Sequence, residues 1–197
     1  MRITGGRARG IPITLPARGE IRPATDYIRE AVFNSVGPLV EGARVLDLFA
    51  GTGAYGLEAL SRGAALATLV DKNPAAATVQ KKNTAAVAKS LGLTDAPVII
   101  INDDATRWSP PVGSPPYDII FADPPWVLWE TAAAELVPRL AAMMDPGEHV
   151  RLILEAPGKF DPPIPPGWRL HRKLAKGKDQ PAATILRREK PEEPETV

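Results

Sequence analysis

Between residues 44 and 155, short apolar runs alternate with longer stretches in which apolar and polar positions follow a helical period. This alternation is typical of strands joined by helices that cover a parallel sheet. The run at 98–101, Val-Ile-Ile-Ile, has no polar alternation, so we expect it to be a central strand covered on both faces. The pattern predicts strands at 44–49, 66–71, 97–102, 117–122 and 150–155, and helices at 54–62, 74–91 and 129–143.

The two ends of the chain add further elements. Runs at 168–174 and 182–187 follow each other without a helix between them, which predicts an antiparallel pair at the sheet edge. Segments 1–4 and 10–15 predict two short strands around a Gly/Arg turn, and Pro12 restricts the second of them to an edge.

Two helix caps and the division of the chain complete the predicted organisation. Thr25 is the expected N-cap of a helix with an apolar face, and Asn73 is the expected N-cap of the helix that starts at Pro74. The fold class is therefore α/β, a doubly wound, mostly parallel seven-stranded sheet with a small N-terminal β-hairpin arm. The expected divisions are an arm at 1–20, one main domain at 21–190 and a proline-rich, disordered tail at 191–197.

Composition narrows the classes of function. The 197 residues, 44% hydrophobic and 24% charged, fit one soluble domain, and no run approaches the roughly 18 apolar residues of a membrane helix. The first residues have no export signal, so we expect a cytoplasmic protein. The absence of cysteine excludes disulfides, thiolate metal sites and a cysteine nucleophile, and the two histidines stand far apart, so no metal site is expected.

Charge is distributed unevenly although the net charge is only +1. Residues 1–44 carry +3, residues 45–150 carry −5, residues 151–190 carry +6 and the tail carries −3. This pattern predicts an acidic middle that holds a cationic or amine-bearing small molecule, and basic ends that meet a polyanion. The alternative is that these are solvated faces of different sign.

The turn after the first strand, residues 47–56, contains a glycine-rich loop. In a doubly wound sheet the ligand binds at this turn, and an acid that ends the second strand holds ribose hydroxyls. Asp71 has that position, twenty residues after the first glycine. The expected cofactor-binding residues of these two segments are Asp47, Phe49, Gly51, Gly53, Gly56 and Asp71.

Asp47 decides between two cofactors. A carboxylate just ahead of the glycines repels a pyrophosphate, whereas it attracts the ammonium and sulfonium groups of S-adenosylmethionine. We therefore expect S-adenosylmethionine, with NAD and a purely structural glycine turn as the alternatives. At the end of the third strand, Asp104, preferred over Asp103, is expected to accept from the adenine amine while the Ala105 amide donates to the ring. Asp104 is also a suitable cap for a short helix.

The segment after the fourth strand, Asp123-Pro124-Pro125-Trp126, is the expected catalytic loop. Methyl transfer to an exocyclic aromatic amine requires acceptors that turn the nitrogen lone pair toward the methyl donor. The Asp123 carboxylate and the Pro124 carbonyl supply two acceptors, Pro125 restricts the loop, and Trp126 offers a face for stacking a flipped base. The alternative is a simple strand-ending turn, since other Pro-Pro pairs occur in the chain.

The chain resembles the bacterial 16S rRNA guanine-N2-methyltransferase (RsmD-like) family over most of its length. The resemblance rests on residues 3–10, 22–34, 47–60 and 123–126, of which the first two are family-specific. It implies a monomeric enzyme that methylates one guanine of small-subunit rRNA in an assembling particle. It also implies that Arg22 and Thr25 lie near the cofactor. Two departures are Trp126, where the family more often has Phe or Tyr, and the proline-rich segment 157–166.

Other functions share some of these features. A methyltransferase acting on DNA adenine N6 or on protein glutamine needs the same amine-orienting loop, although little of the chain lies outside the sheet to read DNA bases. An NAD-dependent oxidoreductase and a non-catalytic RNA-binding module are the alternatives from other classes. We expect the basic ends to contact RNA through Arg7, Arg9, Lys173, Lys176 and Lys178.

Overall fold

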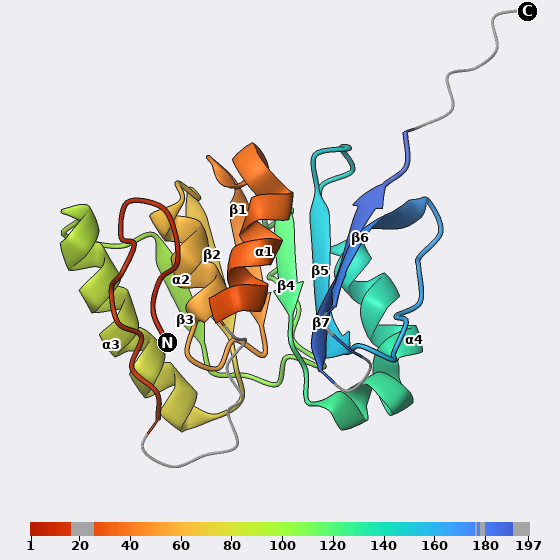
Figure 1. Ribbon diagram of the computed structural model, residues 1–197, viewed down its shortest axis with the longest axis horizontal. Coiled ribbons are helices and arrows are strands. Elements are labelled where there is room, and N and C mark those ends of the chain that lie inside the picture. The colour runs from red at the N-terminus through yellow and green to blue at the C-terminus, as the bar shows by residue number, and fades with distance from the viewer. Residues whose placement is uncertain (17–25, 176, 178–179, 191–197) are drawn as a thin grey trace, which may run out of the picture.

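The computed structural model describes residues 1–16, 26–175, 177 and 180–190. Its centre is a seven-stranded sheet in the order β3-β2-β1-β4-β5-β7-β6, in which the first five strands of the chain are parallel and β7 is antiparallel to both of its neighbours (Figure 1). The doubly wound sheet and its antiparallel edge pair are thus confirmed. The strands are β1 Arg44–Leu48, β2 Leu66–Val70, β3 Val98–Ile101, β4 Ile119–Ala122, β5 Arg151–Pro157, β6 Trp168–Ala175 and β7 Pro181–Arg188.

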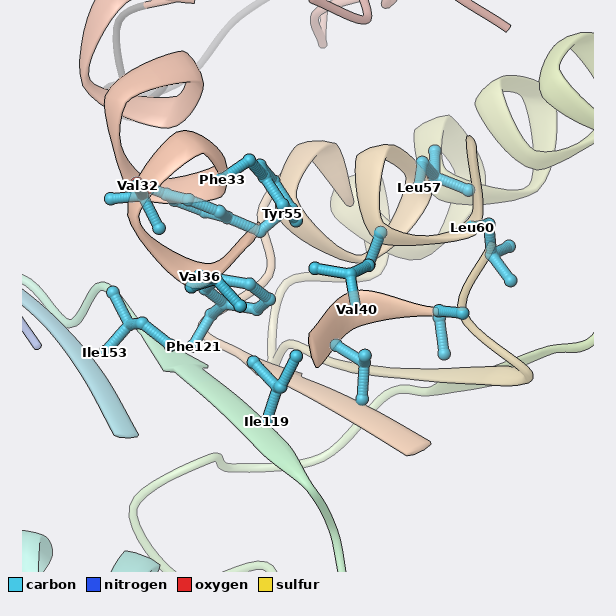
Figure 2. Packing of buried hydrophobic residues seen from close by; sticks show 14 of the residues in the cluster. Val32, Phe33, Val36, Val40, Tyr55, Leu57, Leu60, Ile119, Phe121 and Ile153 are labelled. Atoms are coloured by element: carbon cyan, nitrogen blue, oxygen red, sulfur yellow. The ribbon is translucent and has the colours of Figure 1, made fainter. Parts of the chain in front are cut away.

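Helices cover both faces of the sheet and enclose two apolar clusters. One cluster joins β1, β4 and β5 to the three helices nearest the N-terminus, and Figure 2 shows Phe33, Tyr55 and Phe121 packed there. The other cluster joins the opposite face to the fourth helix through Trp129 and Leu136. The helices are α1 Asp26–Val36, α2 Ala54–Ser61, α3 Pro74–Leu91 and α4 Trp126–Ala142, with a 3₁₀ turn η1 Gly37–Val40 after α1.

Two local predictions require correction. The β3 strand lies at the sheet edge, paired to β2 alone, and Ile99 is 47% exposed. The prediction of a central strand was wrong. An unbroken apolar run shows how hydrophobic the side chains are, but it does not show how many strands pair with that segment. In addition, α4 starts at Trp126 and not at residue 129, so the tryptophan of the expected catalytic loop is the first residue of a helix.

The capping of α3 follows the prediction. Asn73 is the N-cap, its side-chain oxygen accepts a hydrogen bond from the Ala75 amide at 2.9 Å, and Pro74 is the first helical residue. The predicted N-cap Thr25 and the predicted tail 191–197 lie outside the described residues. α1 begins at Asp26, directly after the position expected for its cap.

The N-terminal arm is packed into the main core. Instead of two strands it forms one antiparallel bridge, between Arg2 and Pro12, because its remaining backbone groups bond to α2 as well as across the hairpin. Ile3 is fully buried within the cluster that contains α1 and α2. At the turn, a Cβ on Gly6 would lie 2.1 Å from the carbonyl oxygen of Ser61, so only glycine permits this approach.

A buried ion-pair network ties the arm to the first two helices. Arg29 Nε donates to Glu58 Oε2 at 2.7 Å, and neither side chain is exposed. The Glu58 carboxylate also accepts from Arg62 at 2.8 Å and from the amide and hydroxyl of Thr4, and Arg29 donates to the carbonyl of Arg2. The network therefore joins three segments that are far apart in the sequence.

Candidate cofactor and substrate site

A cavity of about 380 Å³ lies beyond the carboxyl ends of β1 and β4, where the strand order reverses. This is the position at which open α/β sheets bind ligands, and the volume is in the range of small-molecule sites. The cavity brings together ten of the predicted site residues. They are Asp47, Phe49, Gly51, Asp71, Asp104, Ala105, Asp123, Pro124, Pro125 and Trp126.

Gly53 and Gly56 lie behind the loop and do not line the cavity. Gly53 has φ 78°, a conformation that other residues rarely adopt. A Cβ on Gly56 would lie 2.3 Å from a methyl carbon of Leu69, so this glycine lets α2 approach β2 closely. Both glycines shape the loop that places Asp47 and Gly51 at the cavity wall.

Phe49 is the one non-glycine residue with positive φ in the described part of the chain, at 58°. Such strained residues concentrate at functional sites, where surrounding contacts hold them. Here the strain turns the chain between β1 and the glycine loop and puts the Phe49 ring in the cavity wall.

Carboxylates at the ends of β1 and β2 hold the glycine loop. Asp47 Oδ2 accepts from the Gly56 amide at 3.0 Å. Asp71 Oδ2 accepts from the Gly51 amide and its Oδ1 accepts from the Asn73 amide, both at 2.8 Å. Each acid therefore combines a place at the cavity with a structural role.

The third helix also supports the loop, which sequence reasoning did not anticipate. Gln80 Nε2 donates to the Gly51 carbonyl at 3.0 Å, and Asn83 Nδ2 donates to the carbonyl of Thr52 at 3.0 Å and to that of Thr14 at 3.1 Å. Both polar side chains are buried on α3. The available signal was the pair of amide side chains, Gln80 and Asn83, in the predicted helix 74–91 after the second strand.

The adenine side of the predicted site is formed by the turn after β3. Asp104 lines the cavity, whereas Asp103 is exposed and does not. Asp104 Oδ1 accepts from the amide and hydroxyl of Thr106, which lower the pKa of this carboxyl. Within the described residues the Ala105 amide has no hydrogen-bond partner, so it is available to a ligand. Arg139 of α4 donates to the Ala105 carbonyl at 2.8 Å and fixes this turn.

The Asp123–Trp126 segment forms the opposite wall. Asp123 is half-buried, and in the described part of the chain no donor reaches its carboxylate or the carbonyl of Pro124. Pro125 is the N-cap of α4, and its carbonyl accepts from the Leu128 amide at 2.8 Å. The two acceptors required for orienting an amine are thus without a donor among the described residues, on a loop fixed to a helix.

Sequence reasoning missed Tyr55 and Glu155. The Tyr55 hydroxyl donates to Glu155 Oε2 at 2.9 Å, and Tyr55 lines the cavity. The β4 and β5 strands pair Ala122 with Leu154, so the next residues lie side by side: Asp123 directly after β4, and Glu155 within β5. An acid at the end of the fifth apolar run, in the same place as Asp123 after the fourth, was the signal.

These neighbouring acids change one another's ionisation. Burial raises the pKa of Asp47 to about 8, with a further contribution from the charge of Asp71. Burial also raises the pKa of Glu155 to about 7, and burial together with the charges of Glu155 and Asp47 raises that of Asp123. A cation placed in the cavity would stabilise these carboxylates.

This composition fits S-adenosylmethionine better than a dinucleotide. Four aspartates line the cavity, and Lys72 is the one cationic side chain among the described lining residues. A pyrophosphate would face net repulsion, whereas an ammonium or sulfonium would be attracted. The residues that could hold this cofactor are Asp47 for its cationic part, Asp71 for ribose hydroxyls, and Asp104 with Ala105 for adenine. Among the described residues, no group of three or more acids and histidines is arranged to hold a metal ion.

The predicted RNA-binding residues do not gather at the cavity. Arg7 lies where the arm meets the C-terminal ends of α2 and α3: its amide donates to the Ser61 carbonyl at 2.7 Å and its guanidinium to the Leu91 carbonyl at 3.3 Å. Since α2 starts at the cavity and runs away from it, the exposed turn with Arg7 and Arg9 lies about one helix length from the site.

Lys173 lies in β6, on the opposite side of the molecule from the arm (Figure 1). It donates to Asp161 at 2.6 Å and to the Phe160 carbonyl at 3.1 Å, so its charge is already paired. The remaining predictions, Lys176, Lys178, Arg22 and Thr25, lie outside the described residues.

The sheet order, the glycine loop and the acidic cavity are those of a class I methyltransferase. The solved structure of the Escherichia coli protein yhhF superposes with a TM-score of 0.75 at 31% identity, covering 96% of this chain and 98% of that one. A hypothetical protein from Thermus thermophilus gives a TM-score of 0.70 at 27% identity, covering 94% and 98%.

The chain belongs to the family described as conserved hypothetical protein 95, whose model matches residues 1–184. It is 34% identical over 196 residues to Ribosomal RNA small subunit methyltransferase D of Escherichia coli K12, covering 96% of this chain and 90% of that protein. The protein of the same name from Buchnera aphidicola is 30% identical over 175 residues, covering 87% and 85%. No helix in the described segments is long and apolar enough to cross a membrane.

Proposed function

We propose that this chain transfers a methyl group from S-adenosylmethionine to the exocyclic N2 amine of a guanine in 16S rRNA. It would act in the cytoplasm, as a monomer, on the assembling small ribosomal subunit. The observation that carries the chemistry is the pair of free acceptors at Asp123 and Pro124 across a cavity from the acidic glycine loop. The names of the relatives, which act on small-subunit rRNA, support the substrate.

Each described side chain of the site has a separate role in the proposed reaction. S-adenosylmethionine, when bound, supplies an electrophilic methyl group on a positively charged sulfur. Asp123 accepts a hydrogen bond from the guanine amine, which withdraws the nitrogen lone pair from the ring and orients it. As the new N–C bond forms, the methyl–sulfur bond breaks and a neutral thioether is left. The amine loses one proton, and the raised pKa of Asp123 allows that carboxylate to take it. Trp126 lines the same wall, and its ring would stack on the base.

The identity of the methylated group tests this proposal. The protein is incubated with cofactor carrying a labelled methyl group and, separately, with 16S rRNA, assembled small subunits and duplex DNA. We expect label in N2-methylguanosine from the ribosomal substrates. Label in N6-methyladenine of DNA, in protein glutamine, or in no acceptor would contradict the proposal. Samples with Asp123→Ala control for contaminating activity.

Cofactor binding is expected to release protons at pH 7. In the free protein Asp47, with a pKa of about 8, is mostly protonated, and a bound cation favours its charged form. A net release of protons is expected, and affinity should rise as pH increases toward 8 because less protonated carboxyl remains to be ionised. Titration calorimetry at pH 7 in phosphate and in Tris, which differ in ionisation enthalpy, measures the release.

Asp47→Asn is the matched control, since the amide oxygen can still accept from Gly56 but carries no charge. This variant should bind the cofactor more weakly, by about 1.5–3 kcal/mol, with a smaller buffer dependence. Equal heats in the two buffers for the unaltered protein would show that Asp47 does not meet the cation.

A further inference from the structure

Arginines form a row across the three strands at the β6 edge of the sheet. The β6–β7 register pairs Arg169 with Arg187. The β5–β7 register pairs Leu152 with Leu186, which brings Arg151 opposite Arg187 on the other side. Side chains alternate along a strand, so these three arginines point to the face that also holds Ile153 and Ile185, the face covered by α1 elsewhere.

A fourth arginine extends the row along the edge strand. Arg172 pairs with Ile185 after the register shift in β6, which puts it on the same face as Arg187. The neighbouring His171 is exposed, and its pKa is lowered by partial burial and by the charges of all four arginines. We name Arg151, Arg169, Arg172 and Arg187 the arginine row.

The positive charge of the arginine row is not compensated within the described residues. No carboxylate there forms an ion pair with any of its four members. The Nε groups of Arg151 and Arg187 are buried and have no hydrogen-bond partner. Like charges directly opposite one another in a sheet are destabilising, and unpaired buried donors add to the cost. Binding of an anionic partner would therefore lower the electrostatic cost of the arginine row.

We infer that the arginine row binds the phosphate backbone of the RNA substrate, as a second contact surface separate from the methyl-transfer cavity. The inference rests on the proposed function for the identity of the RNA. Guanidinium groups match phosphate oxygens in a planar fork, which suits a backbone contact without base reading. Arg169 and Arg172 are exposed on the edge strand, so an extended polyanion has access that an enclosed metabolite site would not need.

The distance to the cavity suits one continuous RNA. Glu155 lies beside Asp123, and Arg151 lies four residues before Glu155 in β5. At the usual rise per residue of a strand, this separation is roughly 13 Å. A structured RNA that presents a guanine to the cavity therefore has backbone within reach of the arginine row. This surface differs from the arm and from Lys173, which is already paired with Asp161.

The test is the variant with Arg169→Gln, Arg172→Gln and Arg187→Gln. We expect KM for 16S rRNA to rise about tenfold or more, and the slope of log affinity against log salt to flatten by about 0.7–0.9 per lost phosphate contact. The rate at saturating RNA and the Kd for S-adenosylmethionine should not change. The melting temperature should be equal or higher, because like charges have been removed from adjacent strands.

The matched control removes three exposed positive charges from α3, with Lys81→Gln, Lys82→Gln and Lys89→Gln. This control should retain the RNA affinity and salt slope of the unaltered protein. If both variants behave alike while the unaltered protein methylates rRNA, the arginine row is not the RNA surface and the proposed function stands. If the protein methylates no RNA but only the arginine variant weakens direct binding of 16S rRNA, the row stands and the proposed function fails.

Discussion

Replacing Asp123 by alanine is expected to reduce the rate of methyl transfer by about 100-fold or more. The carboxylate lies at the cavity and has no protein donor among the described residues, so the substrate amine is the group that it can orient. Without it the nitrogen lone pair stays conjugated with the ring. Single-turnover measurements with the protein saturated with cofactor isolate this step. Cofactor affinity, measured by calorimetry, should change little.

Two further variants test whether the loss of rate comes from the lost hydrogen-bond acceptor at residue 123 or from the loss of a negative charge. Asp123→Asn keeps an acceptor oxygen and should retain part of the activity. Asp95→Ala removes an exposed acid that lies outside the cavity and has no hydrogen-bond partner among the described residues, and it should react at the unaltered rate. A single-turnover rate for Asp123→Ala equal to that of the unaltered protein would exclude the proposed orientation of the amine.

Replacing Arg29 by alanine is expected to lower the free energy of unfolding by about 3–5 kcal/mol. The change leaves the buried Glu58 carboxylate with Arg62, itself partly exposed, as its remaining cationic partner among the described residues, and it removes the contact between α1 and the carbonyl of Arg2. The arm should therefore loosen together with α1. Equilibrium unfolding in urea measures the loss, and protease digestion should show earlier cleavage near the N-terminus.

The size of this effect is judged against two other variants. Lys173→Ala breaks an ion pair whose acid is 86% exposed, and it should cost at most about 1 kcal/mol. Arg29→Met combined with Glu58→Leu replaces both charges by apolar groups and should recover much of the stability. If Arg29→Ala costs no more than Lys173→Ala, the network does not hold the arm.

The sequence predicted those features whose physical cause lies within a few neighbouring residues. Asn73 and Pro74 cap α3 because a side-chain oxygen and a restricted φ act within one turn. The glycine loop was also predictable, since a positive φ at Gly53 is a demand on that residue alone. Asp47, the acid ahead of this loop, indicated a cationic ligand because the attraction between a carboxylate and a cation requires no knowledge of the rest of the fold.

Errors occurred where the outcome depends on neighbours distant in the chain. The apolar run of β3 is as hydrophobic as a central strand, but only the placement of the other strands makes it an edge. Arg29 and Glu58 are ordinary helix charges in the sequence, and burial by the arm turns them into an internal network. Neither fact has a signature within a single segment.

The sequence by itself determined most strands and helices of the main sheet, the glycine loop and the presence of acids at strand ends. Only the tertiary structure decided which of those acids meet. Tyr55 and Glu155 are 100 residues apart, and their hydrogen bond exists because the sheet brings β5 to the side chain of Tyr55 in the first turn of α2. The arginine row likewise exists only through the pairing of β5, β7 and β6. Such contacts depend on strand order and register, which are set by the packing of the whole sheet.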